Sequence, residues 1–102
     1  MTNIEKKNRE FTGLMEQNGF RYNGKTMYDG TFIYERVWQR ETELVWYGVQ
    51  DTEYRIEASI RFGYPLIRIY CNGRELAHRD YSSPKRAINA MKEIMKYAGF
   101  EF

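Results

Sequence analysis

Nucleophilic chemistry in this sequence would depend on one cysteine, Cys71, and one histidine, His78. A thiol–imidazole pair works only when the two side chains lie within hydrogen-bond reach of each other. Asn72-Gly73 is the strongest hairpin signal in the chain, because a type I′ turn needs positive φ at both central residues. The expected cross-strand pairs are Cys71 with Arg74, Ile69 with Leu76, and Ile67 with His78. Cys71 and His78 then share one face about 13 Å apart, so we expect an inert, buried Cys71.

Acid–base and phosphoryl-transfer chemistry have weaker signals. His78-Arg79-Asp80 repeats the start of the protein-kinase catalytic loop, but Lys85 stands where that loop has its magnesium-binding Asn. Four carboxylates flank two expected turns: Glu41, Glu43, Asp51 and Glu53. Nothing in the sequence distinguishes them from solubilising charges, and a lone histidine gives no cluster of transition-metal ligands. We expect no enzyme, no cofactor and no metal site.

Length and composition predict a single domain, residues 1–102. Hydrophobic residues make up 42% and charged residues 29%, so the chain is too apolar to be disordered and too charged to sit in a membrane. The polar N-terminal segment has no signal-peptide core, and one cysteine cannot form an internal disulfide. We therefore expect a cytoplasmic protein. The formal net charge of +2 is too small to require a polyanionic partner.

Helices are predicted at both ends of the sequence. Residues 3–18 place apolar side chains on one stripe and stop at Gly19-Phe20. Ser83 as N-cap and Pro84 at the first helical position begin a second helix, which stops at Gly99-Phe100. An internal duplication would explain the similar endings, but we favour the interpretation that the same stop signal is used twice.

Strands are predicted between the helices, where the apolar period changes to two. The clearest, residues 54–62, alternates apolar and charged side chains. The other expected strands are 32–38, 44–49, 66–71 and 74–80, with 39–43 as a hairpin loop and a further short hairpin near Asn23-Gly24. This order predicts an α+β domain with a four- to six-stranded antiparallel sheet and both helices on one face.

Aromatic residues make up 17% of the chain, more than its core can easily hold. Both faces of the first two expected strands carry apolar residues, so the sequence leaves their buried face open. If the aromatic faces align on the uncovered side of the sheet, they form a surface rich in interface hot-spot residues. The expected protein-binding residues are Tyr34, Arg36, Trp38, Trp46, Tyr47 and Tyr70.

A basic stripe on the second helix supports an alternative, binding of RNA or DNA. Its residues are Lys85, Arg86, Lys92 and Lys96. Asn72-Gly73-Arg74-Glu75-Leu76 followed by Ser83, Lys85, Arg86 and Ala87 resembles the last strand and helix start of a double-stranded RNA-binding domain, over about a quarter of the chain. Pro84 replaces one basic residue of that pattern, and Ile88 occupies another position that is usually basic.

The leading hypothesis is a small non-catalytic protein that acts by stoichiometric protein–protein interaction. Phages and mobile genetic elements encode such proteins as inhibitors of host defence, and anti-CRISPR proteins are one class. The expected partner is another protein or a protein–nucleic-acid complex, or a second copy of this chain through the open aromatic face. No membrane partner is expected.

Overall fold

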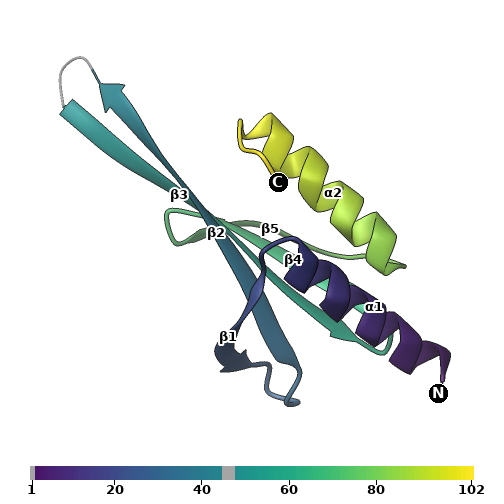
Figure 1. Ribbon diagram of the computed structural model, residues 1–102. Helices are drawn as coiled ribbons and strands as arrows, with labels where there is room; N and C mark the ends of the chain where they lie inside the picture. Colours follow the sequence, from purple (N-terminus) through teal and green to yellow (C-terminus); the bar gives the residue numbers. More distant parts are fainter. Residues whose placement is uncertain (1, 45–47) are drawn as a thin grey trace.

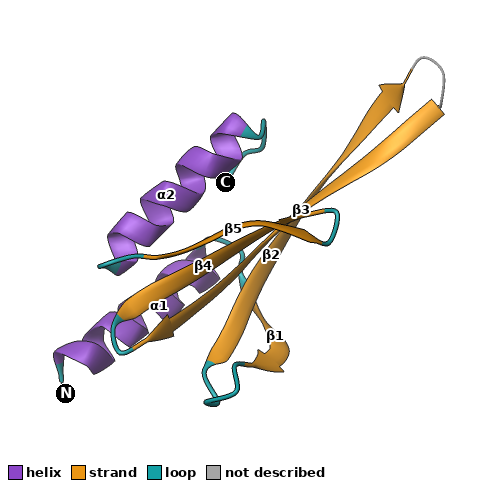
Figure 2. Ribbon diagram, turned by 180° about the vertical axis from the view of Figure 1, so that it is seen from behind, coloured by secondary structure: helices purple, strands orange, loops and turns teal. Residues whose placement is uncertain are grey.

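The computed structural model describes residues 2–44 and 48–102 and confirms the α+β class (Figure 1). The elements in chain order are α1 (Asn3–Gln17), β1 (Arg21–Thr26), β2 (Phe32–Leu44), β3 (Gly48–Arg61), β4 (Tyr64–Cys71), β5 (Arg74–Asp80) and α2 (Pro84–Tyr97). The five strands lie in sequence order in one antiparallel sheet. Both helices cover the same face, as Figure 2 shows from the opposite side.

The helices begin and end where local sequence chemistry predicts. Thr2 Oγ1 accepts a hydrogen bond from Glu5 N at 3.1 Å, and Ser83 Oγ accepts one from Arg86 N at 3.3 Å. Both helices then end with a glycine at positive φ followed by phenylalanine. Phe20 N donates to Met15 O, and Phe100 N donates to Met95 O, each at 2.9 Å.

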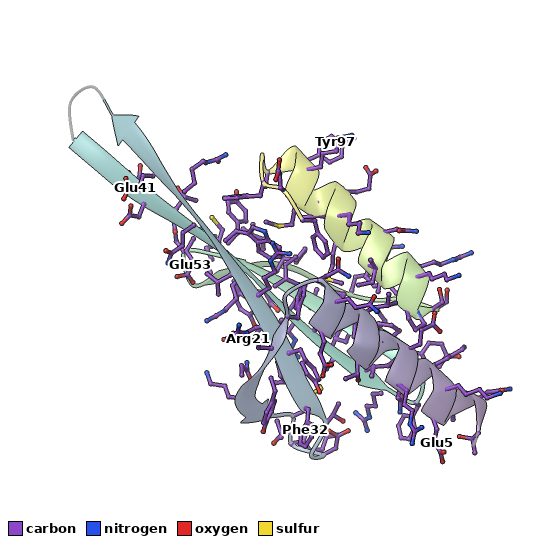
Figure 3. The ribbon with its side chains drawn as sticks, in the orientation of Figure 1. Glu5, Arg21, Phe32, Glu41, Glu53 and Tyr97 are labelled. Atoms are coloured by element: carbon purple, nitrogen blue, oxygen red, sulfur yellow. The ribbon has the colours of Figure 1, made fainter. Side chains whose placement is uncertain are left out.

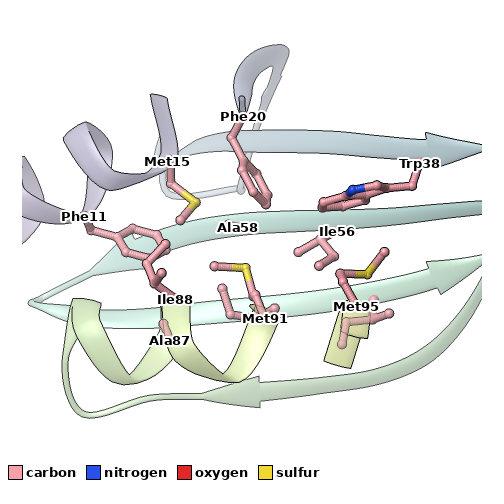
Figure 4. Close-up of a cluster of buried hydrophobic side chains, with 12 residues drawn as sticks. Phe11, Met15, Phe20, Trp38, Ile56, Ala58, Ala87, Ile88, Met91 and Met95 are labelled. Atoms are coloured by element: carbon pink, nitrogen blue, oxygen red, sulfur yellow. The ribbon is translucent and has the colours of Figure 1, made fainter. Parts of the chain in front are cut away.

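The core lies between the helices and the covered face of the sheet (Figure 4). Its helical members are Phe11, Met15, Ala87, Ile88, Met91 and Met95. Its sheet members are Trp38, Ile56, Ala58, Ile67 and Ile69, and Phe20 joins them from the segment after α1. Burying one such large apolar side chain contributes roughly 1.5–3 kcal/mol, and this packing fixes which face of the sheet is covered.

The expected loop at residues 39–43 and the expected strand at 44–49 are wrong. β2 continues through these residues to Leu44, which pairs with Gly48 at the start of β3. β4 ends at Cys71 opposite Tyr54, so the outer parts of β2 and β3 form a two-stranded arm beyond the helices (Figure 1). The two strands of this arm satisfy each other's backbone hydrogen bonds and need no apolar face. Their polar sequence therefore resembled that of a loop.

The expected register of the last hairpin is correct only at the turn. Cys71 pairs with Arg74, and Asn72 and Gly73 have φ of 51° and 81°. Beyond a register shift, Ile69 pairs with Ala77 and Ile67 with Arg79, so the expected partners Leu76 and His78 are wrong by one residue. Leu76 is the extra residue of a bulge and is exposed rather than packed on the core.

The expected short hairpin near Asn23-Gly24 is also wrong. Gly24 has a φ of 82°, but it lies inside β1, where the register with β2 shifts between Tyr22 and Thr26. A positive-φ glycine serves a bulge as well as a turn, so the sequence signal was ambiguous. The chain reverses after β1 instead, where Gly30 N donates to Met27 O at 2.9 Å.

Candidate functional site

Three expected surface residues lie on the covered face of the sheet. Tyr34, Arg36 and Trp38 pair in register with Ala58, Ile56 and Tyr54, which share the face of the core. Trp38 is 7% exposed, and its indole Nε1 donates to Glu101 O at 2.9 Å. The expectation that these residues face away from the helices is therefore wrong.

Arg36 explains why a charged residue occupies this covered face. Its guanidinium donates to Asn18 O at 2.7 Å and to Phe102 O at 3.1 Å. It also stacks over Trp38, 4.4 Å from the ring centroid. Partial burial lowers the pKa of Arg36, and the two carbonyls stabilise its charge. Arg36 thus ties the end of α1 to the C-terminal segment.

Arg40 repeats this role for α2. Its guanidinium donates to Ala98 O at 3.1 Å and lies 4.9 Å from the ring centroid of Phe100. The two arginines therefore bind carbonyls at the C-terminal ends of the two helices, where a positive charge complements the helix dipole. The repeated helix stop is the sequence feature that could have indicated this role of the arginines. Each helix end leaves carbonyl groups that need hydrogen-bond donors.

Tyr70 lies on the open face, as expected. It pairs with Arg55, whose guanidinium carbon is 4.7 Å from the tyrosine ring centroid. Arg55 Nε is buried and has no hydrogen-bond partner among the described residues, and Glu57 Oε1 is 3.7 Å from it. This is an unmet donor on the face that no helix covers. The expected contacts Trp46 and Tyr47 lie outside the described residues.

The β1–β2 loop folds over one end of the open face. Ser59 is buried there, and its Oγ donates to Met27 Sδ at 3.5 Å. Arg61 forms an ion pair with Asp29 at 3.0 Å. Hydrogen bonds from Thr31 hold the pKa of Asp29 below its usual value, and Arg61 contributes in the same direction. A hollow borders this loop, lined by Met27, Ile33, Glu57, Ala58, Ser59, Leu66 and Arg68.

An adjoining hollow is bordered by the exposed aromatic residues Phe62 and Tyr64. We call these two residues and Tyr28, whose ring faces Arg61 of the same hollow, the aromatic rim. The side chains of Tyr28, Phe62 and Tyr64 are 92%, 65% and 57% exposed. The hollow is lined by Met27, Ser59, Arg61, Phe62, Tyr64, Leu66 and Asp80. The guanidinium of Arg61 lies 6.0 Å from the ring centroid of Tyr28 and 5.3 Å from that of Phe62. The sequence analysis did not predict this rim. The sequence feature that could have indicated it is the pair Phe62-Gly63, an aromatic residue followed by glycine.

Phe62 adopts a backbone conformation that phenylalanine rarely takes. Phe62 and Gly63 have φ of 52° and 83°, almost the same as Asn72 and Gly73 at 51° and 81°. Both pairs join adjacent antiparallel strands as two-residue turns. Asparagine tolerates this left-handed region, whereas a bulky residue there is strained by about 1–2 kcal/mol. The fold therefore has one relaxed and one strained turn of the same type.

The expected chemical candidates do not assemble into a catalytic site. Cys71 pairs with Tyr54 on the covered face, whereas His78 pairs with Arg68 on the open face, because the bulge separates them. Cys71 is partly rather than fully buried, and its hydrogen bond with Tyr54 raises the pKa of the phenol.

The expected carboxylates lie on the two-stranded arm. Glu41 pairs directly with Asp51, and Glu53 with Gln39 (Figure 3). The backbone of Glu43 pairs with Val49, and its side chain lies outside the described set. Among residues 2–44 and 48–102, no group of three or more His, Cys, Asp or Glu side chains is arranged to hold a metal ion.

Comparison of the chain with known proteins gives no match to a protein family, to a curated protein or to a solved structure. Of the helices in the described part of the chain, neither is long and apolar enough to cross a membrane.

Proposed function

We propose that this chain is a small non-catalytic protein that binds another protein through the open face of its sheet. The observation that carries the proposal is Phe62, an exposed aromatic side chain held in strained backbone. Asn72 adopts the same φ at low cost, so the fold itself does not require phenylalanine at position 62. Strain of this kind persists where it serves recognition.

The surroundings of Phe62 have the composition of an interface centre. Aromatic residues and arginine dominate binding hot spots, because they bury a large area and retain a polar contact. The rim supplies Tyr28 and Tyr64, Arg61 lies between the rings, and the hollow beside them offers Leu66 and Met27 as an apolar floor. A partner side chain seated there buries apolar surface that the free protein leaves in water.

Arg55 and Tyr70 extend the surface along the sheet. The side chain of Arg55 is 29% exposed, so a carbonyl or carboxylate of the partner would bind the exposed part of its guanidinium group. Tyr70 places its ring beside this donor. We expect these two residues to fix the orientation of the partner and Phe62 to supply affinity.

The finer proposal is an inhibitor that acts by occupying a component of host defence, as proteins of phages and mobile elements do. The small size of the chain and its aromatic content of 17% support stoichiometric binding. The partner is then a protein or a protein–nucleic-acid complex whose surface is blocked.

Affinity capture from host lysate with and without nuclease tests the proposal, followed by titration calorimetry with the recovered partner. Phe62→Asn removes the ring and keeps a residue suited to positive φ. Tyr97→Ala is the matched control, because Tyr97 is 88% exposed on the outer side of α2 (Figure 3). We expect a nuclease-resistant partner whose affinity falls at least about tenfold with Phe62→Asn and is unchanged with Tyr97→Ala. Equal affinity of the two variants contradicts the proposal.

A further inference from the structure

Helix α2 presents a row of cations to solvent on the side away from the sheet. We call Lys85, Lys92 and Lys96 the basic stripe, and Arg86 lies beside it; all four are exposed. With 100° per residue, the three lysines fall within about 40° of one another, and they span about 17 Å of the helix. In the described residues, none of these four side chains forms an ion pair.

Comparison with α1 shows that part of this charge opposes the helix dipole, although Lys96 in the last turn complements it. α1 carries three acidic and three basic residues, with Glu5 in its first turn. α2 carries four basic residues and one acidic residue, and no acidic residue lies in its first turn. Lys85 and Arg86 occupy that turn, where the helix dipole disfavours positive charge. Both helices pack on the same face of the sheet, but only α2 has an excess of basic over acidic residues.

We propose that the basic stripe docks on the sugar-phosphate backbone of double-stranded DNA. Three lysines on one rigid helix complement a row of phosphates. The exposed Tyr97 lies about 120° around the helix from Lys85 and outside the arc of the three lysines, so one ring at the edge of the stripe does not form the row of stacked rings that single strands need. The stripe spans about 17 Å, enough to reach the phosphates on both sides of the major groove of B-form DNA, about 12 Å wide, whereas duplex RNA has a deep and narrow major groove.

Helix α2, which carries the stripe, and the open face lie on opposite sides of the sheet (Figures 1 and 2). A duplex on α2 would therefore leave the aromatic rim free for a protein. This inference is independent of the proposed function, and its test uses different residues. Phe62→Asn is expected to leave DNA affinity unchanged.

Fluorescence anisotropy with a labelled DNA duplex of about 20 base pairs tests the proposal on the full chain. We expect a Kd of about 10⁻⁵ M at about 50 mM salt, and a slope of log K against log salt of about −3, from three phosphate contacts. Absence of binding at low salt overturns the proposal. Equal or tighter binding of a single strand or of duplex RNA also overturns it.

A charge-matched pair of variants separates the stripe from bulk electrostatics. Lys85→Glu with Lys92→Glu changes the net charge by the same amount as Lys6→Glu with Arg9→Glu on α1, where both residues are exposed. We expect the α2 variant to lose at least about tenfold in affinity and the α1 variant less than about threefold. Equal losses show that only net charge matters and overturn the proposal.

Thermal unfolding checks that the α2 variant is folded. Glutamate at position 85 places an acidic residue in the first turn of the helix, which the dipole favours. The unfolding midpoint of this variant is therefore expected to equal or exceed that of the wild type. Replacement of the same two lysines by glutamine provides a neutral second variant, which must also lose affinity.

Discussion

Two arginine–aromatic stacks lie on opposite faces of the same sheet and have different surroundings. On the covered face, the guanidinium of Arg36 lies 4.4 Å from the ring centroid of Trp38, and both side chains donate to main-chain carbonyls. On the open face, the guanidinium of Arg55 lies 4.7 Å from the ring centroid of Tyr70, and its buried Nε–H has no hydrogen-bond partner among the residues described, although Glu57 Oε1 forms an ion pair with it at 3.7 Å. The same pair of residue types stabilises the fold on the covered face and leaves a hydrogen-bond donor unmet on the open face.

The difference shows that residue type does not identify a binding surface. An arginine becomes part of the fold where free carbonyls are within reach, and helix ends supply such carbonyls. Arg36 reaches Asn18 at the end of α1, whereas Arg55 lies on the face of the sheet that neither of the described helices covers. Stability should therefore depend on the covered stack and binding on the open one.

The largest expected effect is on the covered stack. Trp38→Ala removes a buried ring that contacts Phe20 and Phe102, and we expect a loss of about 3–5 kcal/mol in the free energy of unfolding. Tyr70→Ala on the open face should change it by less than about 1 kcal/mol. Urea denaturation of both variants measures the contrast, and equal losses would contradict the assignment of the two faces.

The arginines should differ in the same direction. Arg36→Met leaves the carbonyls of Asn18 and Phe102 without this donor, so we expect a loss of about 1.5–3 kcal/mol. Arg55→Met removes an unmet donor and keeps the apolar stem, but it also removes the ion pair with Glu57, so we expect a loss of less than about 1 kcal/mol. Chemical denaturation of the pair is the measurement; a larger loss from Arg55→Met would refute the comparison.

Phe62→Asn should raise the stability of the free protein. The substitution relaxes the left-handed backbone at φ 52°, and we expect a gain of about 1 kcal/mol. The reverse exchange at the relaxed turn, Asn72→Phe, should cost at least as much, because Asn72 Oδ1 also accepts from Glu53 N at 2.8 Å. Thermal unfolding tests both; destabilisation by Phe62→Asn would remove the argument that position 62 is kept for binding.

The smallest expected effect is the pH dependence of the β1–β2 loop on the open face. The pKa of Asp29 is lowered in the folded protein by its hydrogen bonds with Thr31, so the ionised carboxylate favours folding. This contribution is present above the usual pKa of an aspartate and is lost as pH falls through the lowered value. We expect Asp29→Asn to be slightly less stable than the wild type at neutral pH. The difference should vanish in acid, as unfolding curves at several pH values would show.

Local signals in the sequence determined the ends of the helices and the position of the last turn. Ser83-Pro84 begins α2, Gly19-Phe20 and Gly99-Phe100 end the helices, and Asn72-Gly73 forms the last turn, as predicted. Each signal acts within a few residues, where hydrogen bonds and backbone strain do not depend on the rest of the chain. The α+β class follows from the order of these elements.

Only the tertiary structure decided which side chains face the core. The side chains of β2 alternate between the two faces of the sheet. The set with Tyr34, Arg36 and Trp38 is covered, and there the N–H groups of Arg36 and Trp38 donate to carbonyl oxygens at the end of α1 and in the C-terminal segment. The bulge at Leu76 and the continuation of β2 to Leu44 are likewise set by pairing between strands. The aromatic rim arises in the same way, since Phe62 and Tyr28 come together only when two loops meet over one end of the sheet.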